Sequence, residues 1–155
     1  MKHLKKIAAL WAAAALSLPG SALAGFVWTE SGPNGAGSLL PTAQTTYDSS
    51  FNALSGIQGF LTATVPIGGN PLYQVDLYKI RISDTAGFSA RISDPLVDFG
   101  LFLFDATGMG VYMSEDGDGL NPLLAAGDPN GPLSTGVYYL AVATHGSIAL
   151  DAGLA

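Results

Sequence analysis

Acidic residues gather in one short stretch of this 155-residue chain, Ser114–Gly119 (SEDGDG). Carboxylates on a flexible, glycine-rich turn suit calcium, which takes six to eight oxygen ligands. The stretch is not an EF-hand, because it is too short and no glutamate stands at the twelfth position. It predicts either a cation site at Asp116 and Asp118 or, more commonly for such a sequence, a solvated acidic hairpin turn.

Residues suited to covalent catalysis are scarce. The chain has no cysteine, and of its two histidines only His145 lies beyond the first 24 residues. No serine stands in a G-x-S-x-G elbow. Scattered acids could still converge as a carboxylate pair, as in glycosidases. We therefore expect a protein that is not an enzyme, with a small secreted hydrolase using clustered carboxylates as the alternative.

The first 24 residues read as a signal peptide. Three lysines within the first six residues precede the apolar run Ile7–Leu18. Ala22 and Ala24 then supply the small residues of a cleavage site after Ala24. At 12 residues the run is shorter than the roughly 20 that a membrane span needs. We expect export to the periplasm, cell surface or extracellular space, with no membrane span after signal cleavage.

The exported part is strongly acidic. Removing 24 of the 155 residues leaves 131, with three basic side chains, twelve acidic ones and a net charge of −9. Such a surface repels nucleic acid, which needs clustered Lys and Arg, and favours divalent cations or basic partners. Without disulfides, stability must come from core packing or a bound metal.

Short apolar runs separated by Gly and Pro predict one all-β domain over residues 25–155, an antiparallel β-sandwich of jelly-roll type. The predicted strands are Ile57–Val65, Val75–Ile82, Phe88–Ile92, Phe99–Phe104, Gly110–Met113, Val137–Ala143 and Ser147–Leu150. The predicted core includes Phe60, Tyr78, Ile80, Leu101, Leu103, Tyr139 and Ala141.

Three segments, in this order along the chain, resemble the sequence pattern of a known family. They are YQVDLYKI (73–80), DFGLFLFDATG (98–108) and GVYYLAV (136–142), with the acidic turn between the last two. Together they resemble the bacterial pre-peptidase C-terminal (PPC) domain, a secreted β-sandwich of jelly-roll type. The segment FLFDATGMGVY is similar to the variant of this domain found in exported proteins of the PEP-CTERM type.

This resemblance implies a calcium site and a role. Carried over residue by residue, the ligands would be Glu30, Asn34 and Asp76, which we rank above the acidic turn because separate segments can build a cage. Gly35 stands where the family has a further aspartate, and fewer carboxylates imply weaker binding.

The implied role is that of a non-enzymatic binding or structural module with an extracellular protein or polysaccharide as partner. An accessory domain acting in trans with a secreted peptidase is a further alternative. No PEP motif, apolar tail or basic end follows the last predicted strand, so we expect no anchored product.

Overall fold

The computed structural model describes residues 25–32, 35–47, 53–61, 75–93, 98–115 and 121–144. Within these ranges the chain forms strands and one short 3₁₀ turn, η1 (Leu40–Thr42), so the all-β prediction is confirmed. The strands are β1 (Phe26–Thr29), β2 (Gln44–Thr45), β3 (Leu54–Gln58), β4 (Val75–Ile82), β5 (Ala90–Arg91), β6 (Phe99–Phe104), β7 (Gly110–Ser114), β8 (Leu123–Leu124) and β9 (Gly136–Thr144).

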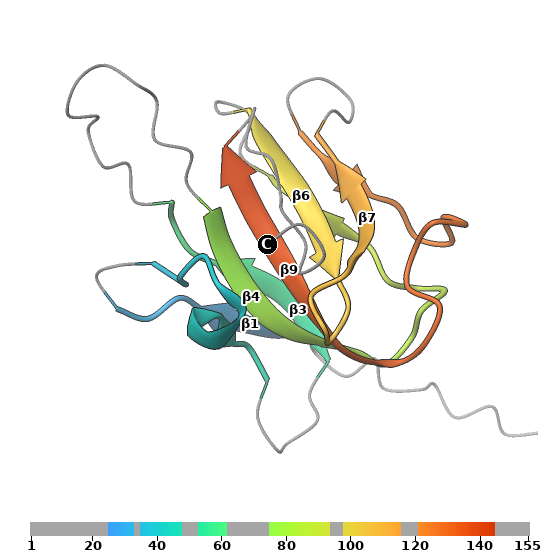
Figure 1. The fold of residues 1–155 in the computed structure, drawn as a ribbon, viewed down its shortest axis with the longest axis horizontal. Coiled ribbons are helices and arrows are strands. Elements are labelled where there is room, and N and C mark those ends of the chain that lie inside the picture. The colour runs from blue at the N-terminus through green and yellow to red at the C-terminus, as the bar shows by residue number, and fades with distance from the viewer. Residues whose placement is uncertain are drawn as a thin grey trace, which may run out of the picture.

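The largest sheet has the strand order β2-β4-β9-β6-β7 (Figure 1). Its middle strands are antiparallel, and β4 pairs with β9 along its whole length. The bounds predicted for β4 and β6 are confirmed. Polar and apolar residues alternate over Lys79–Ile82 of β4, whereas β6 is apolar on both faces and central, as an uninterrupted apolar run indicates.

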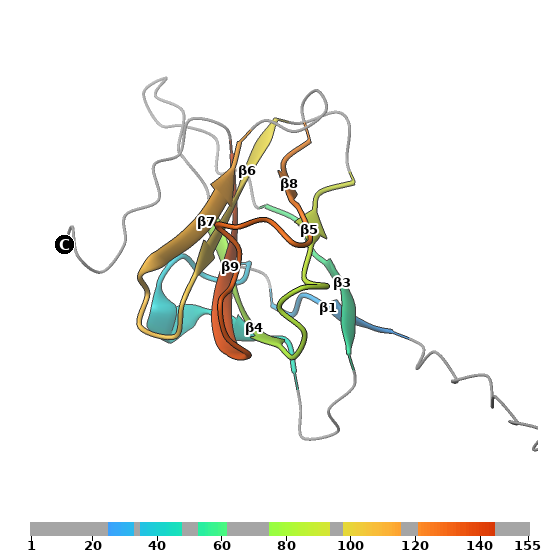
Figure 2. The same ribbon diagram turned by 90° about the vertical axis from the view of Figure 1, so that its right-hand side faces the viewer.

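Two smaller sheets, β1-β3 and β5-β8, pack on one face of this sheet as a second layer (Figure 2). The core between the layers contains Ala36, Tyr78, Ile80, Ile82, Leu101, Leu103, Leu124, Tyr138 and Leu140, with Trp28, Leu54 and Ile57 packed against it. A second buried cluster lies on the opposite face of the large sheet, formed by Leu77, Phe102, Phe104, Tyr139, Ala141 and Ala143.

Strand pairing departs from the prediction in one respect. We expected an antiparallel sandwich, but β1 pairs with β3, and β2 with β4, in parallel. The chain between β1 and β3 crosses to the large sheet to form β2 before it returns, and such a crossover permits parallel pairing.

One predicted core residue is wrongly placed. Phe60 is 60% exposed because β3 ends at Gln58, two residues before it. The predicted strand Ile57–Val65 would have included Phe60. The other predicted core residues are buried. The predicted signal peptide (1–24) and the predicted strand Ser147–Leu150 lie outside the described residues. In the part of the chain that is described, no helix has the length and apolar character to cross a membrane.

Candidate metal centre

Two loops meet where the parallel strands β1 and β3 end. Glu30 directly follows β1, and its N–H donates to the carbonyl of Gln58 at the end of β3, at 2.8 Å. The chain leaving β3 returns the contact, because the N–H of Phe60 donates to Glu30 Oε2 at 2.9 Å. Parallel strands that end side by side thus fix the Glu30 carboxylate between them.

The large sheet supplies the second carboxylate. Asp76 is the second residue of β4 and only 6% exposed, and its Oδ1 accepts the N–H of Ala36 at 3.2 Å. A Cβ built on Gly35 would lie 2.7 Å from Asp76 Oδ1 and 3.4 Å from Glu30 Oε1, so these two oxygens are at most about 6 Å apart. The structure therefore brings together two side chains that are 46 positions apart in the sequence.

Each carboxylate has a second oxygen without a partner. Glu30 Oε1 and Asp76 Oδ2 are buried and accept no hydrogen bond from any described residue. Burial, and then the charge of Glu30, raise the pKa of Asp76 to about 6, against the smaller opposite effect of the Ala36 N–H. Unpartnered buried carboxylate oxygens are costly, and a cation between them would remove that cost.

Aromatic side chains close the site on the core side. The Tyr78 hydroxyl lies at 2.8 Å from the Cβ position of Gly59, next to Glu30 Oε2. Burial, then the charges of Asp76 and Glu30, raise the pKa of Tyr78 far above its ordinary value, so it stays a neutral phenol. Its ring meets Trp28 edge to face at 5.8 Å between centroids, which connects the site to the interlayer core.

Gln44 in β2 fixes the loop that carries Asn34. Its Nε2 donates to the carbonyls of Ser31 at 2.6 Å and Gly35 at 3.0 Å, and its Oε1 accepts the N–H of Ser31 at 3.2 Å. The two ends of the loop are therefore held by one side chain. Asn34 itself, the third predicted ligand, lies outside the described residues.

Two positions around the carboxylates require glycine. Gly35 has φ +73°, and a Cβ there would crowd Asp76 Oδ1. A Cβ at Gly59 would stand 2.5 Å from Glu30 Oε2. The aspartate that the PPC pattern has at the position of Gly35 would take a left-handed backbone here and bring its Cβ to 2.7 Å from Asp76 Oδ1, so one of the two would have to shift. The carboxylates of the described site are therefore Glu30 and Asp76.

The chemistry available here is that of hard oxygen ligands. Among the described residues, no three or more His, Cys, Asp or Glu side chains lie close enough together to hold a metal ion. The remaining ligands of a bound ion would therefore be carbonyls, waters or Asn34. The backbone at Gly35 and Gly59 passes so close to the carboxylates that even an added Cβ would meet their oxygens, and Asp76 is buried. This space suits a small ion better than the sugar ring and attacking water that a carboxylate hydrolase must hold between its acids.

The alternative ligands cannot be placed. Asp116 and Asp118 lie outside the described residues, as does His145. Asp105, by contrast, accepts hydrogen bonds within its own turn. Thr107 and Met109 donate to Asp105 Oδ1, and together these hydrogen bonds hold the pKa of Asp105 below its ordinary value.

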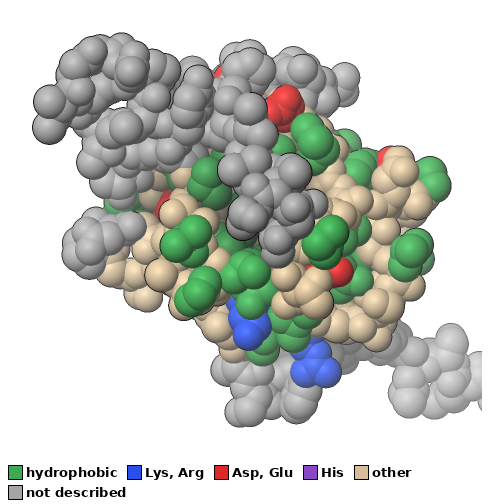
Figure 3. All heavy atoms as spheres, in the orientation of Figure 1, with side chains coloured by type: hydrophobic (Ala, Val, Ile, Leu, Met, Phe, Trp, Pro, Cys, Tyr) green, Lys and Arg blue, Asp and Glu red, His purple; other side chains and the backbone are tan. Residues whose placement is uncertain are grey.

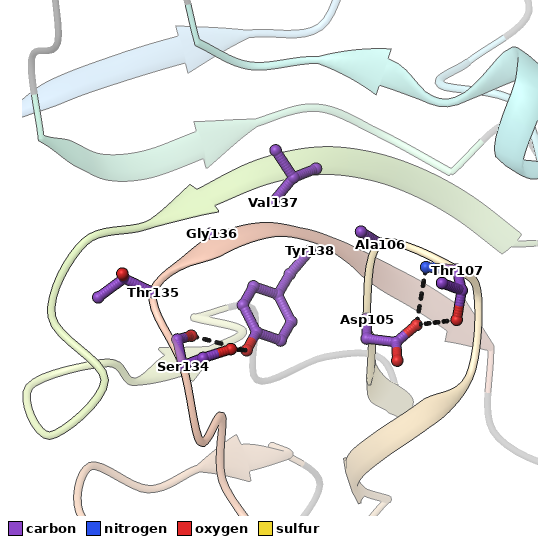
Figure 4. Close-up of a pocket in the computed structure, with 8 residues that line it drawn as sticks. All are labelled: Asp105, Ala106, Thr107, Ser134, Thr135, Gly136, Val137 and Tyr138. Carbon is purple, nitrogen blue, oxygen red and sulfur yellow. Dashed lines mark hydrogen bonds between the residues drawn. The ribbon is translucent and has the colours of Figure 1, made fainter.

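A pocket of about 230 Å³ lies beside this turn, lined by Asp105–Thr107 and Ser134–Tyr138 (Figure 4). Two of its side chains already make hydrogen bonds within the lining. The Asp105 carboxylate accepts from Thr107, and the Tyr138 hydroxyl donates to the Ser134 carbonyl at 2.7 Å (Figure 4). The pocket therefore presents no group comparable with the two unpartnered oxygens of the Glu30–Asp76 site.

Sequence reasoning missed several parts of this site. The Ala36 and Phe60 N–H groups carry no side-chain signal, and Phe60 was assigned to the core. Tyr78 could have been found, because an aromatic residue two positions after Asp76 on an alternating strand must share its face. Searches against family models, curated proteins and solved structures give no match to this chain.

Proposed function

We propose that this chain is an exported, non-enzymatic binding or structural module, a PPC-like β-sandwich of jelly-roll type that calcium stabilises. The ion would be held by Glu30 and Asp76 from their separate strands, with Asn34 as a third ligand. The observation that supports this proposal most is the pair of buried carboxylate oxygens, Glu30 Oε1 and Asp76 Oδ2, which accept no hydrogen bond from any described residue.

Calcium would act on the fold through the elements that it joins. Glu30 follows β1 and Asp76 stands on β4, so one ion would connect the second layer to the large sheet. With two carboxylates and the remaining ligands neutral, affinity should be that of an extracellular module, about 10⁻⁴–10⁻³ M. At tenfold excess over Kd the folded state would gain about 1.4 kcal/mol.

The test is a calcium titration of the protein beginning at Gly25. Trp28 is then the single tryptophan, and its edge-to-face contact with Tyr78 makes its fluorescence a reporter of the site. Saturable binding by calorimetry, a change in Trp28 emission and a rise in melting temperature over chelator are expected. All three should be lost in Glu30→Gln and Asp76→Asn.

Asp84→Asn is the matched control. Asp84 is exposed and accepts only the N–H groups of its own turn, from Ala86 and Gly87 at 3.1 Å, so its loss removes one negative charge away from the site. Calcium binding should survive this change. An identical wild-type melting temperature in calcium and in chelator would overturn the proposal. Binding that survives Asp76→Asn but not Asp116→Ala would move the site to the acidic turn.

A panel of peptidase, esterase and glycosidase substrates tests the non-enzymatic part. Turnover by the wild type that disappears in His145→Ala, or in Asp76→Asn, would replace the binding module by a hydrolase.

A further inference from the structure

The strand β7 is an edge of the large sheet and has no charged residue or proline among its own five residues. It ends the order β2-β4-β9-β6-β7, and its sequence, GVYMS, contains neither lysine nor proline. The opposite edge, β2, is only two residues long. Natural proteins shield edges with short strands, charges or prolines, because an open edge pairs with other chains. Figure 2 looks onto β7 and shows no described strand laid along its outer side.

Backbone groups at the centre of β7 face outward. Leu77 of β4 donates its N–H to Gly37, away from β9. One row of partners crosses the sheet from Leu77 through Ala141 and Phe102 to Met113. In an antiparallel pair, the N–H and C=O of one residue point either toward the opposite residue or away from it. Leu77 and Ala141 point away from each other, so Ala141 points toward β6 and forms hydrogen bonds with Phe102. The N–H and C=O of Met113 must then point away from β6, toward a further strand.

An apolar pocket accompanies this free edge. It is an open depression of about 200 Å³, lined by residues 102–104 of β6 and 110–113 of β7. It exists because Gly110 stands opposite Phe104 without a side chain, and a Cβ there would meet nothing within 4 Å. Met113, at 54% exposure, borders it. Figure 3 looks onto this face of the sheet and shows hydrophobic side chains there.

Acidic groups surround the same strand. Asp105 precedes the turn into β7, Glu115 follows its end, and Asp128 accepts the hydroxyl of Tyr112 at 2.8 Å. On this face the basic side chains of the large sheet lie at the far side, near the lower end of β4 (Figure 3). Three strand spacings, about 14 Å, separate β4 from β7.

From the open edge, the pocket and the acidic surroundings, we propose that β7 binds an extended segment of another protein by strand addition, and that the segment alternates apolar and basic side chains. Its backbone would bond the outward groups of Met113, and one apolar side chain would enter the pocket over Gly110. A second copy of this chain fits poorly, because antiparallel pairing of two β7 strands would set the Glu115 end of each beside the Asp105 end of the other. The proposal is independent of calcium at the Glu30–Asp76 site.

The probe is a fluorescein-labelled heptapeptide, KVKLKVK, measured by anisotropy on the protein beginning at Gly25. Two peptides serve as controls: KVKPKVK has the same charge but cannot pair at its centre, and EVELEVE has the opposite charge. We expect KVKLKVK to bind at least about tenfold more tightly than KVKPKVK, which loses a backbone hydrogen bond with its apolar contact. EVELEVE should bind more weakly than KVKLKVK because the acidic side chains around β7 repel it.

Three variants separate strand pairing from charge attraction. Met113→Pro removes the outward N–H without touching the bonds to β6, and Met113→Val keeps it. Gly110→Val fills the pocket and leaves the backbone groups in place, so it tests the site even if the proline variant fails to fold. The proline and Gly110→Val variants should lose about tenfold in affinity and Met113→Val should not. Equal binding of KVKPKVK, or unchanged binding by Gly110→Val, would overturn the proposal, and so would dimerisation of the chain that Met113→Pro abolishes.

Discussion

Replacing Asp76 by asparagine should stabilise the calcium-free protein at pH 7, although it removes a proposed calcium ligand. Asparagine keeps the oxygen that accepts the Ala36 N–H and removes the negative charge that faces Glu30. The wild-type protein carries that buried charge without a partner on Oδ2. The variant is free of this penalty.

The pKa of Asp76 gives the size of the effect. Folding raises it from 3.8 to about 6, and each pKa unit corresponds to about 1.4 kcal/mol, so ionised Asp76 costs the folded state about 3 kcal/mol at pH 7. Because the folded pKa is the higher one, the folded state binds the proton more tightly. The penalty is therefore fully present above pH 6, decreases as the pH falls through 6 and is gone below 3.8.

Urea unfolding in chelator, from pH 4 to pH 8, measures this difference directly. Asp76→Asn should exceed the wild type by about 3 kcal/mol at pH 7, or about 10 °C in melting temperature, and the two should converge toward pH 4. Asp84→Asn, which changes the same charge in an exposed turn, should show no such gain. At tenfold excess of calcium over Kd the difference should narrow by about 1.4 kcal/mol, since only the wild type should bind the ion.

A loss of stability in Asp76→Asn at pH 7 in chelator would refute the reasoning. So would a gain that is independent of pH, because a packing effect does not titrate. Either result would mean that burial and the charge of Glu30 do not raise the pKa of Asp76 in the folded protein.

Three further predictions concern the core, the glycine loop and the leader. Leu103→Ala should cost about 2–5 kcal/mol in urea unfolding, since Leu103 is 1% exposed, whereas Phe60→Ala should cost far less at 60% exposure; equal costs would contradict the core. Gly32→Ala should cost about 1 kcal/mol for its left-handed backbone, and Gly35→Ala clearly more, because its Cβ would also meet a buried carboxylate oxygen at 2.7 Å. Mass spectrometry of exported protein should find Gly25 as the first residue, and an intact Met1 there would reject the signal peptide.

The two long middle strands could be predicted because their pattern extends over several residues. Alternation along β4 and the apolar run of β6 gave both bounds. The strands that were missed, β1, β2 and β8, have four, two and two residues, which is too short for a period of two to emerge. Phe60 was wrongly assigned to the core because it lies just after the end of β3. An apolar residue type alone does not show where strand pairing stops.

The site was predictable only in part, and through resemblance. Glu30 and Asp76 stand in segments that share no local pattern, and nothing in their spacing requires that they meet. Parallel pairing of β1 with β3 is what places the Glu30 carboxylate over β4, and parallel pairing has no signature in strands of this length. The backbone N–H groups of Ala36 and Phe60 donate to the two carboxylates, and backbone donors cannot be predicted from residue type.

The position of the carboxylates has a consequence for how the two layers stay together. The chain has no cysteine, and its second layer consists of two-stranded sheets, which are marginal without support from packing. Trp28 on Tyr78 is one such apolar support between the layers. The Glu30–Asp76 pair lies beside the same contact, and the charge of Glu30 contributes to the raised pKa of Asp76. A cation bound between the two carboxylates would attract both, so we predict that the stability of the β1-β3 layer, more than that of the large sheet, depends on calcium. In chelator, amide hydrogen exchange should therefore become faster in residues 26–30 and 54–60, while the paired strands β4, β9 and β6 stay protected. Equal loss of protection in both layers would contradict this prediction.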